Sequence, residues 1–365
     1  MDAISAPARC RACVSGRQTV AEDDHPSRRK PAQERERTMS TNSPPDAAQQ
    51  IEIYRRMALI KANDERSRKV IKTGKLVMPY YSPRGQEVIP SAVSVNLTDA
   101  DYICTIYRGS HDQLAKGLPL KDLWAEVAGR TDGTCKGKGG PMHVTYPAKG
   151  IMVTTGIVGS TMPIANGLAW ASQLKRDRRV TIAYFGDGAS NIGAFHEALN
   201  LASVWKLPVV FVCQNNEWGE HTRYEKATSA PRIADRAVAY AMPGVRVDGN
   251  DPLAMFAAAK EAIERARSGG GPTLVEAMTY RFHGHVFGDA DSYMDKDRKA
   301  AAIAADPVPR FRAQLIAEGI ATEAQLAAME AQIEAEIDEA VDFALASPFP
   351  GIEELARDVF AAEAV

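Results

Sequence analysis

Short runs of apolar residues alternate with helical segments through the middle of this chain. Helices between consecutive strands make those strands run parallel, and strands that are apolar throughout need cover on both faces. The alternation therefore predicts an α/β fold with a doubly wound, mainly parallel sheet and helices on both faces. Ligands of such sheets bind beyond the carboxyl ends of the strands. We expect strands at 180–185, 208–213 and 273–280, and helices at 162–174, 192–206 and 252–268.

Helical patterns also flank this central region. Residues 48–75 carry apolar side chains at roughly helical spacing, which predicts a long amphipathic helix. Residues 301–346 are rich in Ala and Glu and should form a helical C-terminal extension. By contrast, residues 131–161 are so dense in glycine that they cannot be regular throughout, and we expect this loop to line a site.

The two ends of the chain differ from the rest. Residues 1–48 are rich in polar residues and proline and have no periodic pattern, so we expect a disordered N-terminal tail. An acidic cluster in this tail argues against a transit peptide, and Met39 is an alternative start. One folded domain is expected over 49–350, followed by a C-terminal tail at 351–365.

Charge and cysteine content exclude several classes of protein. The chain has 44 Lys and Arg against 46 Asp and Glu, so we expect neither a nucleic-acid partner nor an anionic membrane surface. No apolar run approaches the roughly 20 residues that span a bilayer. The five cysteines are odd in number and scattered, which favours a reducing, cytoplasmic location. Cys10 and Cys13 form a lone CxxC without partners, a weak signal for zinc.

Two polar motifs end neighbouring strands. Asp187 lies between two glycines after the strand at 180–185, and Asn216 ends the next strand, 29 positions later. Parallel strands bring both to the same edge of the sheet. One carboxylate, one amide oxygen and a backbone carbonyl near Trp218 suit a magnesium ion that also binds a diphosphate. The flanking glycines would let the phosphates approach the backbone closely, and a helix that starts near Ser190 would offer them its free N–H groups.

Other interpretations of these motifs fit less well. A dinucleotide fingerprint needs a third glycine where Asn191 stands, and the chain has no GxxxxGK[ST] phosphate loop. A tight turn without any ligand is common for Gly-Asp-Gly alone, but it does not explain the pair of asparagines after the next strand. Arg108 on its own is compatible with a surface salt bridge. His283 and His285 lack the third ligand of a zinc site.

At this point the sequence resembles a known family. A GDG motif followed about 30 residues later by NN is similar to the thiamine diphosphate motif. Its surroundings resemble the alpha subunits of pyruvate, branched-chain 2-oxo acid and acetoin dehydrogenases over about residues 50–350, in the segments GTCKGKGGPMH (133–143), GIVGSTMPIANGLA (156–169), ASVWKLPVVFVCQNNEWG (202–219), PGVRVDGND (243–251) and GPTLVEAMTYRFHGH (271–285).

The resemblance implies a role for each matching residue. Asp187, Asn216 and the Trp218 carbonyl would bind Mg²⁺. The diphosphate would contact Tyr107 and Arg108, and the aminopyrimidine ring would contact Gly156 and Val158. His285 would touch the cofactor and assist acyl transfer as the catalytic residue. The full set implied for thiamine diphosphate is Tyr107, Arg108, Gly156, Val158, Asp187, Gly188, Ala189, Asn216 and His285.

The resemblance also implies a reaction and its partners. The expected activity is decarboxylation of a pyruvate-like 2-oxo acid with transfer of the acyl group to a lipoyl carrier on a dihydrolipoyl acyltransferase. A beta subunit would complete the site in an alpha-two beta-two heterotetramer. Cleavage of acetoin or another diketone or acyloin is the alternative, because Tyr81 and Ser110 stand where close relatives have histidine, with His111 one position further along. We expect these three residues near the substrate and leave their roles open.

Overall fold

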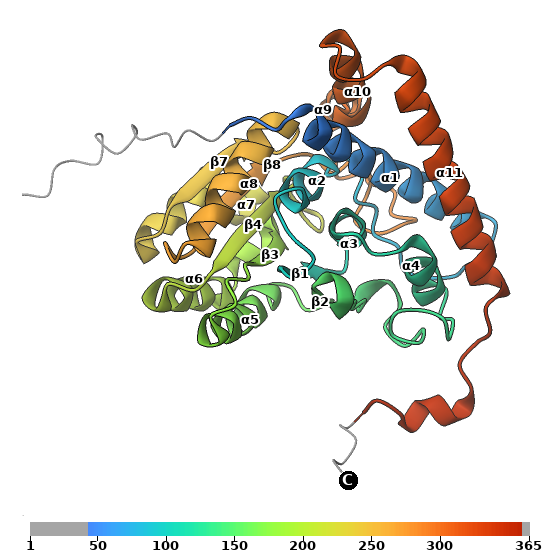
Figure 1. Cartoon of the computed structure of the whole chain (residues 1–365), viewed down its shortest axis with the longest axis horizontal. Helices are drawn as coiled ribbons and strands as arrows, with labels where there is room; N and C mark the ends of the chain where they lie inside the picture. Colours follow the sequence, from blue (N-terminus) through green and yellow to red (C-terminus); the bar gives the residue numbers. More distant parts are fainter. Residues whose placement is uncertain (1–42, 360–365) are drawn as a thin grey trace, which may run out of the picture. The chain divides into compact units, whose positions relative to one another are not determined.

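Six parallel strands form the central sheet of this protein (Figure 1). The structure is a computed structural model, and it describes residues 43–359. Their order across the sheet is β2-β1-β3-β4-β8-β7, and every pairing between neighbours is parallel, which confirms the predicted fold class. The strands are β1 (Tyr102–Ile106), β2 (Ile151–Thr155), β3 (Thr181–Gly186), β4 (Val209–Asn215), β7 (Gly244–Asp248) and β8 (Thr273–Met278).

Helices cover both faces of this sheet, because successive side chains along a strand point to opposite faces. On β3, Ile182 and Tyr184 belong to one hydrophobic core, and Ala183 and Phe185 belong to the other. Helices on one face of the sheet contribute to the first core, and helices on the opposite face contribute to the second (Figure 1). The first set includes α2 (Val88–Ser94) and α8 (Pro252–Arg267), and the second includes α5 (Thr161–Lys175) and α6 (Gly193–Trp205).

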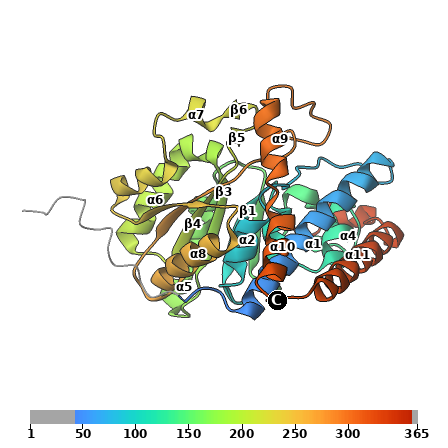
Figure 2. The same ribbon diagram turned by 90° about the horizontal axis from the view of Figure 1, so that it is seen from above.

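The N-terminal helix and the C-terminal extension pack together. The helix α1 (Ala47–Lys72) starts in a capping box, in which the Asp46 carboxylate accepts from the Gln49 amide at 2.8 Å. The long helix α11 (Glu323–Ala346) contacts α1 and α4, and the three lie side by side in Figure 2. The remaining helices are α3 (Ser110–Lys116), α4 (Leu120–Val127), α7 (Tyr224–Ala227), α9 (Lys296–Ala304) and α10 (Pro307–Ala317).

Two details differ from the sequence analysis. The glycine-dense stretch 131–161 contains the edge strand β2, which pairs with β1 and was not expected. The helix expected near Ser190 begins later, at Gly193, because Ile192 is extended and separates α6 from a 3-10 turn, η4 (Asp187–Asn191). It is this turn, and not the α-helix, that follows the tip of β3.

The ends of the chain are described in part. Residues 1–42, including Cys10, Cys13 and Met39, lie outside the described range, and α1 begins at Ala47. At the other end, the tail expected at 351–365 is described as far as residue 359 and contains a 3-10 turn, η6 (Ile352–Ala356). No helix within residues 43–359 has the length and apolar character needed to cross a bilayer.

The strand order fixes where a ligand binds. From β1 the chain moves to β2 on one side of it and then to β3 on its other side. The chain therefore leaves β1 toward one side of the sheet and β3 toward the other. Between these two connections a crevice forms beyond the carboxyl ends of the strands. A two-stranded hairpin of β5 (Trp218–Gly219) and β6 (Thr222–Arg223) follows β4 at the same edge.

Asp101 links the amino ends of β1 and β3 to the end of α8. Its side chain is fully buried just before β1, where it accepts from the Thr98 amide at 2.8 Å and the Val180 amide at 2.9 Å. Arg267, at the end of α8, donates to both of its oxygens at 2.9 Å. Burial alone would raise the pKa of Asp101, but Arg267 and the two amides outweigh it and hold the pKa below its ordinary value.

We predict that Asp101→Asn lowers the free energy of unfolding by about 1–3 kcal/mol at pH 7, because hydrogen bonds to a buried charge are lost. A carboxylate with a depressed pKa stabilises the fold above its unfolded pKa, near 3.9, and this contribution disappears as the pH falls through the folded pKa. Urea unfolding of both proteins should therefore show a gap that narrows below about pH 4. A gap that is the same at pH 7 and at acidic pH would contradict this role.

Candidate functional site

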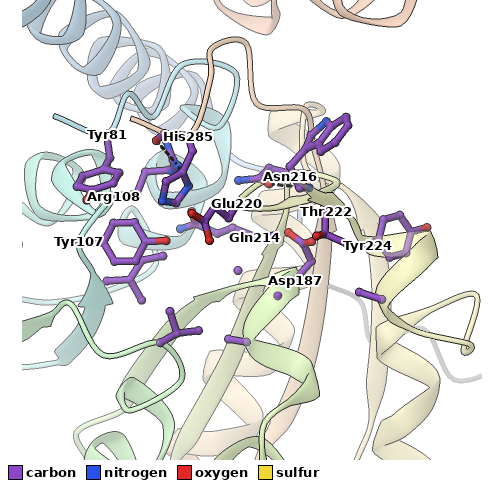
Figure 3. Close-up of a pocket in the computed structure, with 18 of the residues that line it drawn as sticks. Tyr81, Tyr107, Arg108, Asp187, Gln214, Asn216, Glu220, Thr222, Tyr224 and His285 are labelled. Carbon is purple, nitrogen blue, oxygen red and sulfur yellow. Dashed lines mark hydrogen bonds between the residues drawn. The ribbon is translucent and has the colours of Figure 1, made fainter. Parts of the chain in front are cut away.

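A cavity of about 550 Å³ opens at the carboxyl ends of β1, β2, β3 and β4 (Figure 3). The structure brings all ten of the predicted cofactor and metal residues to its walls, although they come from segments far apart in the sequence. They are Tyr107, Arg108, Gly156, Val158, Asp187, Gly188, Ala189, Asn216, Trp218 and His285.

Asp187 is the most unusual group in this cavity. It is 2% exposed, and neither of its carboxylate oxygens has a hydrogen-bond partner among residues 43–359. Burial raises the pKa of Asp187 to about 7. A buried carboxylate without donors is unfavourable unless a cation compensates it. The next residue, Gly188, lies close to the hairpin, and a Cβ on it would stand 3.2 Å from Gly219 Cα.

Asn216 lies beside Asp187 because β3 and β4 are neighbours in the sheet. Its Nδ2 donates to Gln86 Oε1 at 2.5 Å, and its Oδ1 accepts from the Trp218 amide at 3.1 Å. The preceding Asn215 turns the other way and donates to Glu276 at 2.8 Å. One carboxylate, one amide oxygen and nearby backbone carbonyls form a set of oxygen donors that fits Mg²⁺.

Arg108 is buried beside the cavity and has no carboxylate partner among the described residues, so the surface salt bridge considered above does not form. Its Nη1 donates to the Ser82 carbonyl at 2.8 Å, and its Nη2 donates to the His285 carbonyl at 2.9 Å. Burial and then repulsion from Arg281 lower the pKa of Arg108 to about 10. It therefore remains a cation at neutral pH, which suits an anionic ligand.

His285 stands in an aromatic cluster at the rim of the cavity. Its ring centroid lies 5.3 Å from that of Tyr81 and 5.9 Å from that of Tyr107. The His285 amide donates to Asp289 Oδ2 at 2.7 Å, which fixes the loop. Burial, followed by repulsion from Arg108 and Arg281, lowers the pKa of His285 to about 4. The imidazole is therefore neutral at pH 7 and can accept or donate a hydrogen bond.

Two other histidines, His283 and His111, do not line the cavity. His283 contacts Arg68 Nη1 at 2.7 Å, away from His285, and no group of three His, Cys, Asp or Glu side chains within residues 43–359 is arranged to hold a metal ion. The expectation that His111 lies near the substrate is wrong. Its side chain is fully buried behind the cavity wall, with Nε2 2.8 Å from Gln214 Oε1. Ser110 lines a small adjoining pocket, and Tyr81 lines both this pocket and the main cavity.

Sequence reasoning missed several wall residues. Gln86 and Gln214 line the cavity and bond to each other at 3.1 Å. Arg281 is buried close by and donates to the Glu220 carbonyl at 2.9 Å and to the Tyr293 hydroxyl at 2.8 Å. The one available signal was an arginine directly after an apolar strand, in TYRFHGH, which is unusual for a surface residue.

Comparisons with known proteins identify the family of this chain. The family model of the dehydrogenase E1 component matches residues 54–353. The alpha subunit of the Bacillus subtilis acetoin:2,6-dichlorophenolindophenol oxidoreductase is 43% identical over 84% of this chain and 92% of its own length. The chloroplastic pyruvate dehydrogenase E1 component subunit alpha-3 of Oryza sativa subsp. japonica is 38% identical over 85% of this chain and 75% of its own.

The pyruvate dehydrogenase E1 component subunit alpha of Porphyra purpurea is 35% identical over 85% of this chain and 92% of its own. These relatives and the family match extend over almost the whole folded part of the chain. The chain is therefore a member of the dehydrogenase E1 component family, an alpha subunit of the thiamine-diphosphate-dependent 2-oxo acid dehydrogenases.

Proposed function

We propose that this chain anchors the diphosphate of thiamine diphosphate through a Mg²⁺ ion held by Asp187, Asn216 and the Trp218 carbonyl. The observation that carries this proposal is the buried Asp187 carboxylate, whose two oxygens have no donor among the described residues. A divalent cation would compensate this charge, and the diphosphate and water would supply its remaining oxygen ligands.

The other walls of the cavity suit the rest of the cofactor. Arg108 would bind the diphosphate together with the Tyr107 hydroxyl, since a guanidinium held by two carbonyls still has N–H groups to donate. Backbone groups of Gly156 and Val158, after β2, would contact the aminopyrimidine ring. Gly188 and Ala189, in the turn after β3, would approach the phosphates closely.

In this proposal the residues of the chain bind, orient and shield. When bound, thiamine diphosphate supplies the nucleophilic thiazolium carbon and the electron sink for bond cleavage next to the substrate carbonyl. His285 stays neutral at pH 7 and would hydrogen-bond the reacting oxygen or the acyl group in transfer. Tyr81 and Tyr107 pack edge-on at 4.6 Å and would keep water from this side of the cavity.

The reaction that we propose is oxidative decarboxylation of a short, pyruvate-like 2-oxo acid, with transfer of the acyl group to the lipoyl arm of a dihydrolipoyl acyltransferase. A beta subunit in an alpha-two beta-two heterotetramer would provide the carboxylate that activates the aminopyrimidine ring. A cytoplasmic location belongs to the same proposal. The proposed decarboxylation is supported by the pyruvate dehydrogenase relatives and by a cavity lined by the expected cofactor residues.

Cleavage of acetoin or a related diketone is a second candidate. One structural observation favours it: Tyr81 replaces the expected histidine at the rim of the cavity, in contact with His285. At neutral pH a phenol accepts a proton much less readily than an imidazole does, which weakens an acyl-transfer role for this position. The Bacillus subtilis relative, named for acetoin, is 43% identical to this chain.

We predict that Asp187→Asn has opposite effects with and without ligand. The asparagine keeps the shape of the side chain but removes an uncompensated buried charge, so the ligand-free protein should melt at a higher temperature than wild type. Magnesium and thiamine diphosphate together should raise the melting temperature of the wild-type assembly with its beta subunit, and should leave the variant unchanged. Equal stabilisation of both proteins by the cofactor would contradict a metal site at Asp187.

A substrate panel separates the two candidate reactions. We expect the reconstituted alpha and beta subunits, with an artificial electron acceptor, to turn over pyruvate with a larger kcat/KM than acetoin. Branched 2-oxo acids serve as the comparison for chain length. A larger kcat/KM for acetoin than for every 2-oxo acid would establish the second candidate. Absence of cofactor-dependent turnover of any of these compounds by the assembled subunits would contradict both.

A further inference from the structure

A row of buried amides leads from Asn216 into the core. Asn216 Nδ2 donates to Gln86 Oε1 at 2.5 Å, and Gln86 Nε2 donates to Gln214 Oε1 at 3.1 Å. Gln214 Nε2 then donates to Asp112 Oδ1 at 2.7 Å. We refer to Asn216, Gln86, Gln214 and Asp112 as the amide row. All four side chains are nearly or fully buried, and they come from three separate parts of the chain.

The far end of the amide row sets its direction. Both Asp112 oxygens accept hydrogen bonds, one from Gln214 Nε2 and the other from the Thr105 hydroxyl, so Gln214 points its NH₂ group inward and its oxygen outward. His111 Nε2 lies 2.8 Å from Gln214 Oε1. Burial raises the pKa of Asp112, while His111 and the two donors act in the opposite direction. Each amide in turn fixes the orientation of the next.

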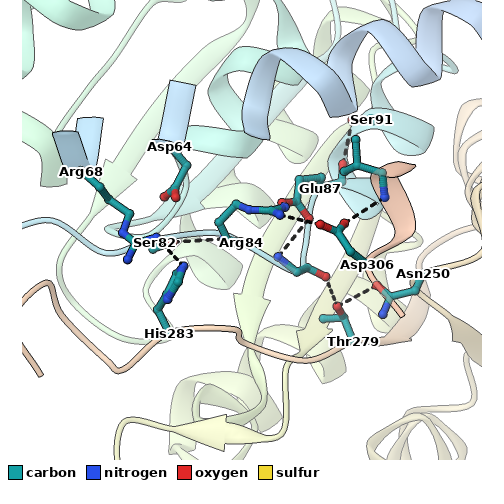
Figure 4. Close-up of polar contacts among 12 residues, drawn as sticks. Asp64, Arg68, Ser82, Arg84, Glu87, Ser91, Asn250, Thr279, His283 and Asp306 are labelled. Carbon is teal, nitrogen blue, oxygen red and sulfur yellow. Dashed lines mark hydrogen bonds and ion pairs between the residues drawn. The ribbon is translucent and has the colours of Figure 1, made fainter. Parts of the chain in front are cut away.

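The backbone on both sides of Gln86 is also held in place (Figure 4). Arg84 forms ion pairs with Glu87 and with Asp306, which lies at the start of α10. The Thr279 hydroxyl donates to the Gly85 carbonyl. Gly85 has φ +96°, and a Cβ there would stand 2.0 Å from the Tyr280 carbonyl oxygen, so only glycine fits this close approach. The side chain of Gln86 therefore starts from a fixed point.

We propose that Gln86 is a positioning residue for the metal site: by accepting from Asn216 Nδ2, it turns the amide so that Oδ1 faces the cation. This inference rests on the proposed Mg²⁺ site. The Trp218 amide, which donates to Asn216 Oδ1 at 3.1 Å, favours the same orientation, but it is a longer contact than the one to Gln86. Without Gln86 the amide rotates by 180° more easily, and the NH₂ group that it then presents to the cation is not a metal ligand. Partners of metal ligands commonly fix ligand orientation in this way, and their loss weakens metal binding about 10- to 100-fold.

The test measures the Mg²⁺ concentration that half-saturates thiamine diphosphate binding, by calorimetry on the assembly with its beta subunit. Gln86→Met keeps the length of the side chain but removes its acceptor and donor. We expect it to raise this concentration about 10- to 100-fold. The control is Asn63→Leu, which also removes a buried amide, bonded to Trp124 Nε1 at 2.9 Å, but outside the amide row and the cavity. It should leave the Mg²⁺ requirement unchanged.

The same substitution made in an Asn216→Asp protein separates loss of amide orientation from a general disturbance of the site. In Asn216→Asp the two side-chain oxygens are equivalent, so the cation meets an oxygen whichever way the group turns. Gln86→Met should therefore have little effect in the Asn216→Asp background and a large one in the wild type. Equal losses in both backgrounds, or no loss in either, would overturn the role of Gln86. A wild-type assembly that binds no cofactor in a magnesium-dependent way would instead overturn the proposed function.

A further variant keeps the test decisive if Gln86→Met does not fold. Gln86→Glu still accepts from Asn216 Nδ2 but no longer donates to Gln214. If Gln86 acts by accepting from Asn216 Nδ2, this variant should bind Mg²⁺ with the same or a higher affinity, since its added negative charge lies on the side of the cation site. A tenfold loss in Gln86→Glu would contradict the proposal.

Discussion

A buried carboxylate without a hydrogen-bond donor is unfavourable by several kcal/mol unless a cation or a proton compensates it. The fold holds Asp187 in this state, because the parallel order of β1, β3 and β4 leaves a crevice at their carboxyl ends and places the turn after β3 at its base. Asn216, Gln86 and Gln214 are bonded to one another, and Arg108 is bonded to backbone carbonyls, whereas the Asp187 carboxylate has no partner among the described residues. We infer that a cation arrives with the cofactor and compensates this charge.

The charges around this point favour a cation and an anion together. Arg108 and Arg281 are buried near Asp187 and donate to backbone carbonyls and a tyrosine hydroxyl, not to carboxylates. Both guanidinium groups therefore keep their charge for a ligand. Because the same two groups, with burial, keep His285 neutral, the rim of the cavity can offer a hydrogen bond without adding a third cation. A magnesium diphosphate matches this distribution of charge.

Sequence patterns predict the parts of the site that depend on local structure. Apolar runs alternating with helices locate β3, β4 and β8, and hence place Asp187 and Asn216 side by side. The edge strand β2 pairs with β1 and lies in a glycine-rich segment, so its short apolar run does not stand out as a strand in the sequence. Gln86 and Asn216 are 130 positions apart, and no spacing rule connects them. His111 was misplaced because successive residues of a helix point in different directions: Ser110 faces the small pocket, and the next residue, His111, points into the core.

Anomalous scattering from Mn²⁺ would test the central claim most directly, since manganese can replace magnesium at oxygen sites. Crystals of the alpha and beta assembly, grown with Mn²⁺ and thiamine diphosphate, should show one strong anomalous peak about 2 Å from the Asp187 carboxylate and the Asn216 amide oxygen, in contact with the diphosphate. A well-ordered cofactor whose manganese peak lies away from both side chains would contradict the account.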